Sequence, residues 1–122
     1  MNKIDVYDST LRDGSQGEGI SFSIEDKLKI ASALDPLGVA FIEAGNPASN
    51  RKDQEFFQAA GDLRLEHAKL VAFGSTRRRG KSASEDGNLN ALLEAGTEYV
   101  TVFGKSWSFQ VSEILHATKE EN

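Results

Sequence analysis

The sequence has 122 residues, 39% of them hydrophobic, and a net charge of -5, a composition typical of one globular domain. The acidic balance disfavours nucleic acid and anionic membranes as partners, and no apolar run approaches the ~20 residues of a membrane span. The absence of cysteine excludes disulfides and thiolate metal sites. With no apolar run of signal-peptide length at the N-terminus, we expect a cytoplasmic protein.

The first third of the chain alternates between strand and helix patterns. Residues 4–7 predict a short strand. Apolar residues at steps of three and four predict a helix over 24–37, which begins after the capping residue Ser23 and ends at Gly38. The continuous apolar run at 39–42 is typical of a strand that is covered on both faces.

The same alternation continues to the end of the sequence. The expected elements are a helix over 53–60 that resumes over 63–67, a strand at 70–73, a helix over 89–95 closed by Gly96, a strand at 99–103 and a last helix from Val111. Four βα units of this spacing favour a parallel sheet with right-handed crossovers. They suit either a small open sheet or half of a closed eight-stranded barrel.

Polar residues follow each of the four predicted strands. They lie at 8–16, 43–50, 74–77 and 104–107. Because the carboxyl ends of parallel strands meet at one edge of a sheet, we expect these residues to share a site there.

Three residues at this edge indicate the chemistry of the site. Asp13 offers a carboxylate to a hard divalent cation such as Mg²⁺ or Mn²⁺. Arg12 offers a planar guanidinium that matches a carboxylate or a developing oxyanion. Glu43 follows an apolar strand directly and is expected to be partly desolvated, which would raise its proton affinity and suit it to a catalytic role beside Arg12. Together they suit metal-assisted chemistry on an α-keto acid, although Arg12 with Asp13 also fits a surface ion pair and Glu43 an ordinary strand-end residue.

Other candidate residues have simpler interpretations. The basic run Arg77–Arg79 fits a solvated loop or an anion-binding loop. His67 and His116 fall in predicted helices and are expected to be ordinary surface residues. Trp107 is expected to be a packing residue.

The N-terminal barrel half of the Claisen-type acyl-CoA condensing enzymes is similar to two segments here, DSTLRDGSQGEG and IEDKLKIASALDPLGVAFIEAGNPASNRKDQEFF. That family includes isopropylmalate, homocitrate and citramalate synthases, with hydroxymethylglutaryl-CoA lyase as a relative. The citramalate synthase branch most resembles two further segments, VAFGSTRRRG and VTVFGKSWSFQVSEILHATKEEN.

The resemblance implies a TIM barrel, acetyl-CoA as co-substrate, an α-keto acid and a divalent metal, which is Mg, Mn or Zn. By position, Asp13 matches the metal-binding aspartate and Arg12 the arginine that stabilises the enolate or carbonyl oxygen. Gln16 matches a polar residue near the substrate, and Glu43 a glutamate that ends the second strand. With pyruvate, the implied product is citramalate.

The sequence departs from the citramalate branch at several positions. Within the second segment the substitutions are Ala44, Asn46, Ala48 and Arg51, and around residues 108–110 an expected aspartate and histidine are missing. The third strand is followed by no histidine, which disfavours homocitrate synthases. The family's His-x-His metal ligands are also absent, so we expect residues 1–122 to be the N-terminal half of a catalytic barrel that binds metal weakly and is inactive alone.

Other functions remain open. The parent protein also fits a 2-isopropylmalate synthase or, less well, a lyase or carboxyltransferase relative. The chain also fits a non-enzymatic domain that binds small anions and self-associates. Four βα units leave an inner sheet face uncovered, which we expect to be lined by Val6, Ile42, Val71 and Val102 or their neighbours, and this favours a homodimer.

Overall fold

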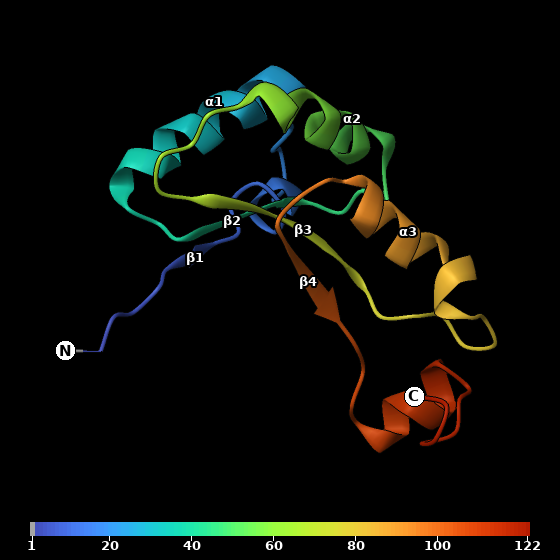
Figure 1. The fold of residues 1–122 in the computed structure, drawn as a ribbon. Coiled ribbons are helices and arrows are strands. Elements are labelled where there is room, and N and C mark those ends of the chain that lie inside the picture. The colour runs from blue at the N-terminus through green and yellow to red at the C-terminus, as the bar shows by residue number, and fades with distance from the viewer. Residues whose placement is uncertain (1) are drawn as a thin grey trace.

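The computed structural model describes residues 2–122 and contains one four-stranded sheet with helices on one face (Figure 1). The strands are β1 (Tyr7–Asp8), β2 (Phe41–Gly45), β3 (Lys69–Ser75) and β4 (Tyr99–Phe103). The helices are α1 (Ile24–Leu34), α2 (Arg51–Ala59) and α3 (Gly87–Glu94). Short 3₁₀ turns cover Gly14–Gln16, Asp35–Leu37, Ala60–Asp62 and Ala83–Glu85, and a π-helical turn covers Gln110–Ile114.

The sheet order is β1-β2-β3-β4, and every neighbouring pair is parallel. Each strand is therefore joined to the next by a crossover that contains a helix, which confirms the predicted parallel α/β arrangement. The register of β2 on β3 shifts between Glu43 and Gly45, so β2 carries a bulge directly after Glu43.

Local capping sets where α1 begins and ends. The Ser23 side chain accepts a hydrogen bond from the Asp26 backbone N–H and the Asp26 carboxylate accepts one from that of Ser23, as the capping-box pattern predicts. Because Pro36 lacks an N–H, α1 gives way to a 3₁₀ turn after Leu34. This turn ends at Gly38, which has φ 81°. The predicted helix therefore ends early.

Several other predicted element bounds are wrong. The first strand was predicted over 4–7, but it covers only Tyr7–Asp8. Residues 63–67 form no helix. There the Asp35 carboxylate accepts hydrogen bonds from the backbone N–H groups of Glu66, His67 and Ala68, which holds the segment in a bend before β3. The last predicted helix is only the π-helical turn, and His116 lies beyond it with φ 50°.

The hydrophobic core lies between the sheet and the helices. It includes Ile42 and Ala72 from the strands and Phe56 and Leu92 from the helices. Gly74 allows α3 to approach, because a Cβ there would lie 3.0 Å from a Leu92 methyl carbon. In the part of the chain described here, no helix has the length and apolar character needed to cross a bilayer.

The opposite face of the sheet carries aromatic and polar side chains. The Phe41 ring lies 6.0 Å from the Tyr7 ring and 5.2 Å from the Tyr99 ring, centroid to centroid. This face was expected to carry Ile42 or its neighbours: the neighbours Phe41 and Glu43 lie on it, whereas Ile42 belongs to the core on the helix side. By strand alternation Val102 also points to the helix side, where it is 51% exposed.

Candidate active site

A tight loop after β1 directs Arg12 toward the sheet. The Ser9 carbonyl accepts hydrogen bonds from the backbone N–H groups of Arg12, Asp13 and Gly14, and the Ser15 hydroxyl donates to the Arg12 carbonyl. Leu11 is fully buried and anchors the loop in the core. The loop is therefore held on both sides of Arg12.

The guanidinium group of Arg12 is held by a hydrogen bond at one edge and by an aromatic ring against one face. Its Nε donates to Glu43 Oε1 at 2.5 Å, and its guanidinium carbon lies 4.1 Å from the centroid of the Phe73 ring. The Glu43 side chain is 2% exposed, and that of Arg12 is 23% exposed. The contact thus joins a buried carboxylate to a guanidinium that still reaches the surface. Hydrogen bonds between charged partners are stronger than those between neutral ones.

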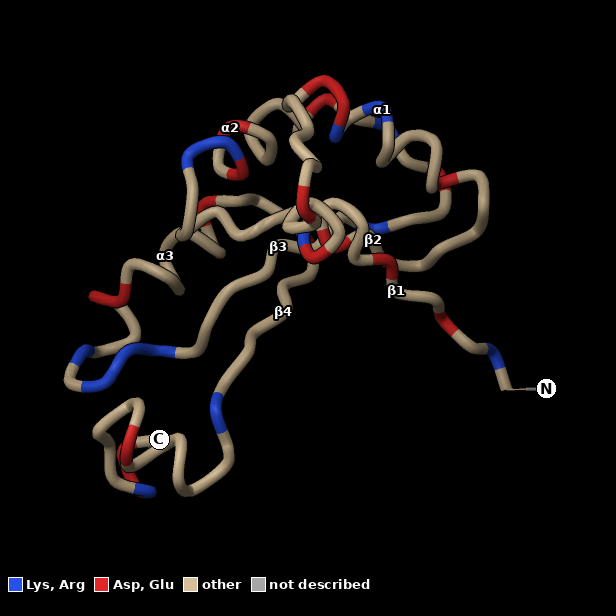
Figure 2. Tube along the Cα trace, turned by 180° about the vertical axis from the view of Figure 1, so that it is seen from behind, with Lys and Arg blue, Asp and Glu red and all other residues tan. Residues whose placement is uncertain are grey.

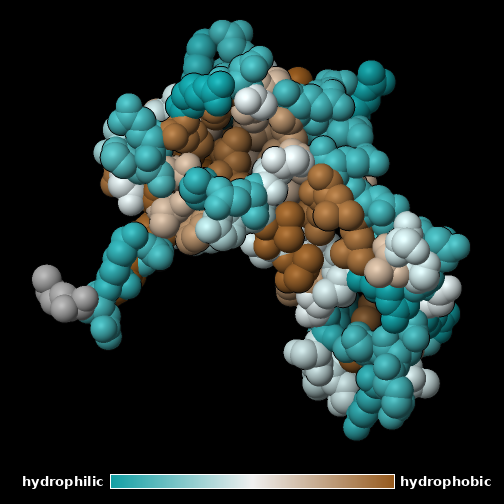
Figure 3. Space-filling view, in the orientation of Figure 1, coloured by the Kyte–Doolittle hydropathy of each residue, from teal (hydrophilic) through white to brown (hydrophobic). Residues whose placement is uncertain are grey.

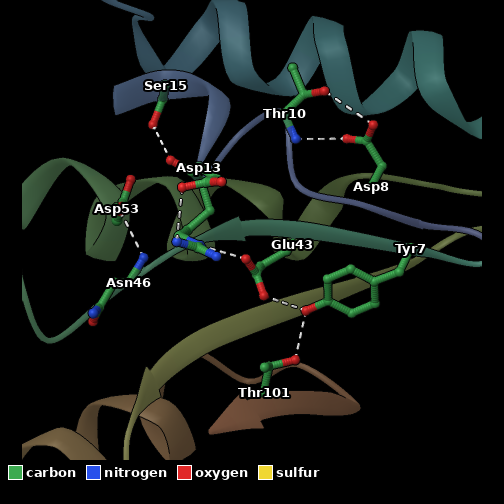
Figure 4. Close-up of polar contacts among 10 residues, drawn as sticks. Tyr7, Asp8, Thr10, Asp13, Ser15, Glu43, Asn46, Asp53 and Thr101 are labelled. Atoms are coloured by element: carbon green, nitrogen blue, oxygen red, sulfur yellow. Dashed lines mark hydrogen bonds and ion pairs between the residues drawn. The ribbon is translucent and has the colours of Figure 1, made fainter. Parts of the chain in front are cut away.

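The second oxygen of Glu43 is also engaged. The Tyr7 hydroxyl donates to Glu43 Oε2 at 2.5 Å and lies 2.6 Å from Thr101 Oγ1 on β4 (Figure 4). Burial, followed by the hydrogen bond to the Glu43 carboxylate, raises the pKa of Tyr7 to about 12. Both carboxylate oxygens therefore have a donor.

Asp13 and Gln16 lie on the outer side of the same loop. The Asp13 side chain is 65% exposed, and its Oδ1 lies 3.4 Å from Arg12 Nη1. Gln16 is exposed and lines a cavity of about 520 Å³ together with Arg12 and Phe73. The structure thus brings Arg12 and Glu43 into contact, whereas Asp13 and Gln16 reach the solvent beside them.

The far wall of this cavity is the loop after β2, which Asp53 holds in place. Asp53 accepts a hydrogen bond from Lys27 Nζ at 2.6 Å and another from the Asn46 backbone N–H at 2.8 Å. Gly45 has φ 150°, and a Cβ there would lie 2.4 Å from Asp53 Cγ. The loop therefore requires glycine at this position.

A second cavity, of about 550 Å³, lies where β3 and β4 end, and the basic run borders it. Arg77 Nη1 donates to Glu121 at 2.8 Å, and Arg79 donates to the His116 carbonyl. Figure 2 shows the basic segment beside the C-terminal segment. Arg77 is therefore paired within the chain, unlike an arginine of a free, solvated loop.

Sequence reasoning missed Tyr7, Thr101 and Phe73 as neighbours of the site. The β1–β2 register pairs Tyr7 with Phe41, and alternation along β2 puts Glu43 on the same face as Phe41. The sequence shows the alternation but not the register. Nothing in it indicated that Tyr7 would reach Thr101, 94 residues away.

Comparison with known proteins identifies the family. A model described as HMGL-like matches residues 3–122. An (R)-citramalate synthase of Aquifex aeolicus is 53% identical over 98% of this chain and 23% of its own length. One of Synechocystis is 53% identical over 96% of this chain and 21% of its own length. The chain thus spans less than a quarter of these relatives.

Structural comparison agrees on the fold. A crystal structure of HMG-CoA lyase from Bacillus subtilis superimposes with a TM-score of 0.67 at 20% identity, over 98% of this chain and 38% of the lyase chain. The four parallel strands and three connecting helices have the arrangement of half a TIM barrel, as the sequence predicts. The chain belongs to the HMGL-like family.

Proposed function

We propose that this chain is the N-terminal half of the catalytic barrel of a synthase that condenses acetyl-CoA with pyruvate to give citramalate. Relatives named (R)-citramalate synthase, at 47% to 53% identity, support this choice of reaction. The observation that carries the proposal is the position of Arg12, which Glu43 and Phe73 hold at the wall of a cavity.

In the proposed reaction, a general base takes a proton from the methyl group of acetyl-CoA, the enolate attacks the keto carbon of the α-keto acid, and the keto oxygen takes up a proton. Water then hydrolyses the thioester, which leaves a carboxylate on the product and releases CoA. Arg12 presents N–H groups to the oxygen on which negative charge develops, and this stabilises the transition state more than the ground state. Gln16 contacts the substrate from the same wall.

Glu43 acts in this proposal as a positioning residue. Its side chain is buried and both of its oxygens accept hydrogen bonds within the protein, one from Arg12 and one from Tyr7. It therefore orients Arg12, although the sequence suggested a direct catalytic role.

A divalent metal, Mg²⁺, Mn²⁺ or Zn²⁺, would be held in part by Asp13. The exposed Asp13 carboxylate suits a hard cation, but the described residues contain no group of three or more His, Cys, Asp or Glu side chains able to hold a metal. Residues 2–122 thus supply one candidate metal ligand, Asp13, and we expect them to bind a metal weakly. When bound, such an ion polarises the keto carbonyl.

The remaining expectations follow from this assignment. The partners are small molecules, acetyl-CoA and the keto acid, with no nucleic acid or membrane, and the location is the cytoplasm. The chain alone is expected to show no turnover.

A second candidate is 2-isopropylmalate synthesis from a branched α-keto acid. A probable 2-isopropylmalate synthase of Archaeoglobus fulgidus is 33% identical over 99% of this chain, a weaker match than the citramalate synthases. A domain without enzymatic activity that binds small anions is the third candidate.

A chimaera tests the proposal. Residues 1–122 replace the matching segment of the Aquifex aeolicus citramalate synthase, and CoA release is followed with pyruvate and with the branched keto acid. We expect pyruvate to be preferred. Arg12→Lys is expected to lower kcat about 10²–10³-fold, since one oxyanion donor is misplaced.

The controls separate the three candidates. Arg51→Lys changes an exposed helix residue and should leave kcat unchanged. Preference for the branched keto acid would favour isopropylmalate synthesis. A folded chimaera without activity toward either keto acid would contradict the enzyme assignment.

A further inference from the structure

We propose that Tyr7 is a positioning residue of the condensation site: its hydroxyl fixes Glu43, and Glu43 in turn fixes Arg12. The inference rests on the proposed function, because Arg12 is the residue that meets the developing charge. Tyr7 lies on β1, Glu43 on β2 and Thr101 on β4, and Arg12 belongs to the loop after β1. Figure 4 shows Tyr7 between Glu43 and Thr101.

The direction of the hydrogen bonds follows from the groups involved. An ionised carboxylate only accepts, so the single Tyr7 hydroxyl proton points to Glu43 Oε2 over 2.5 Å. The Thr101 hydroxyl, 2.6 Å from the Tyr7 oxygen, must then be the donor of that second bond. The hydrogen bonds thus run in one direction, from Thr101 to Tyr7 and from Tyr7 to Glu43. Glu43 accepts a further hydrogen bond from Arg12.

Removing the Tyr7 hydroxyl would leave Glu43 Oε2 buried without a donor. Among residues 2–122, every buried side-chain nitrogen and oxygen has a hydrogen-bond partner. An unsatisfied carboxylate oxygen is costly, so Glu43 is expected to rotate or to draw in water. Either change moves Oε1, to which Arg12 Nε is bonded at 2.5 Å.

A purely packing role for Tyr7 makes a different prediction. The Tyr7 ring packs against the Phe41 ring, and Tyr7→Phe would preserve this contact. If packing were its only role, this variant would behave as the parent. Tyr7→Phe therefore separates the two roles.

The kinetic test uses the chimaera described above. Tyr7→Phe is expected to lower kcat about ten- to a hundredfold with little change in the KM for pyruvate, because misplacement of a group that acts in the transition state is costly. Thr101→Val should also lower kcat relative to the parent chimaera. Thr101→Ser keeps the hydroxyl and should have the kcat of the parent. Tyr99→Phe is the matched control: Tyr99 packs on the same face, and its hydroxyl makes no hydrogen bond within the described residues.

A spectroscopic test needs no activity and uses the 122-residue chain. The Arg12 Nε–H, bonded to a carboxylate, is expected to give a downfield ¹H–¹⁵N signal that is protected from exchange. The signal should shift and lose protection in Tyr7→Phe but not in Tyr99→Phe.

The outcomes are distinguishable. If the parent chimaera releases no CoA, the proposed function fails and the Arg12 signal alone decides this inference. A parent chimaera that is active, with a Tyr7→Phe variant of equal kcat, overturns the inference and leaves the proposed function intact. An Arg12 signal unchanged in Tyr7→Phe also overturns it.

Discussion

Lys27 on α1 and Asp53 on α2 form a buried ion pair, with 2.6 Å between Nζ and Oδ1 and side chains that are 3% and 14% exposed. Lys27 Nζ also lies 5.0 Å from the centroid of the Phe56 ring. The pair joins two helices and, through Asp53, holds the loop that ends β2.

Breaking this pair should destabilise the fold strongly. Asp53→Ala is expected to lower the free energy of unfolding by about 3–5 kcal/mol, because it leaves the Lys27 ammonium buried without its partner. Urea unfolding followed by circular dichroism measures the change. Glu55→Ala, which breaks the exposed Arg51–Glu55 pair, is the control and should cost no more than about 0.5 kcal/mol. Equal effects of the two variants would contradict the structural role of Asp53.

Gly45 should not tolerate a side chain. Gly45→Ala is expected to cost at least about 2 kcal/mol, since the backbone lies outside the regions usual for alanine and the new Cβ would clash with Asp53. Gly61→Ala provides the comparison, because a Cβ at Gly61 meets nothing within 4 Å. Thermal unfolding of both variants tests this, and a Gly45→Ala protein as stable as Gly61→Ala would contradict the expected clash.

Stability should fall in acid partly because of Asp35. Hydrogen bonds from backbone N–H groups, that of Ala68 first, hold the pKa of Asp35 below its ordinary value of 3.8. The folded protein thus binds this proton less readily than the unfolded chain. The contribution is fully present above the unfolded value and is lost as pH falls through the folded value.

Asp35→Asn should accordingly flatten the dependence of the unfolding free energy on pH below about 4. Ser32→Ala removes an exposed hydroxyl on α1 that does not titrate in acid, so this control should leave the slope unchanged. Urea titrations at a series of pH values measure both slopes. A parent and an Asp35→Asn variant with parallel curves would show that Asp35 has no such role.

Tyr7 should ionise at unusually high pH. The chain has two tyrosines, and the pKa of Tyr7 is raised from 10.0 to about 12. The unfolded chain therefore releases this proton first, so stability is lost as pH rises from 10 toward 12. Ultraviolet titration should show a late transition that Tyr7→Phe removes and urea shifts to lower pH. A titration above pH 10 that Tyr7→Phe leaves unchanged would be inconsistent with the hydrogen-bonded Tyr7 hydroxyl.

The uncovered sheet should promote self-association. Apolar side chains of β4 are about half exposed, and Figure 3 shows hydrophobic surface between the helices and the C-terminal segment. We expect a dimer at micromolar concentration, which Phe103→Lys should weaken about tenfold, because strand alternation puts the exposed Phe103 on the uncovered face together with Tyr99 and Thr101. Leu93→Lys, on α3, is the control with an exposed leucine. Analytical ultracentrifugation that finds only monomer would contradict this prediction.

The sequence predicted the elements that have strong local signals. The strand at 99–103 matches β4 residue for residue, and the capping box at Ser23 matches the start of α1. Alternation of strands and helices was sufficient to place Arg12 and Glu43 at the same end of the sheet, because that placement follows from topology alone.

The errors have tertiary causes. Residues 63–67 carry an apolar spacing that suits a helix, but the Asp35 carboxylate binds their backbone from 31 residues away. Ile42 was assigned to the wrong face because a continuous apolar run gives no alternation from which to choose a face. The partners of Glu43 could not be inferred either, since they come from strands distant in sequence.

The hydrogen bond between Tyr7 and Thr101 joins the first and last strands of the sheet. In a flat sheet, strands separated by three spacings would be roughly 14 Å apart, farther than a tyrosine and a threonine can span side by side. The sheet must therefore curl so that its edges approach over the aromatic face. The curvature required for barrel closure is thus already present within these four strands. The hydrogen bond between Tyr7 and Thr101 connects the two edges of the curved sheet.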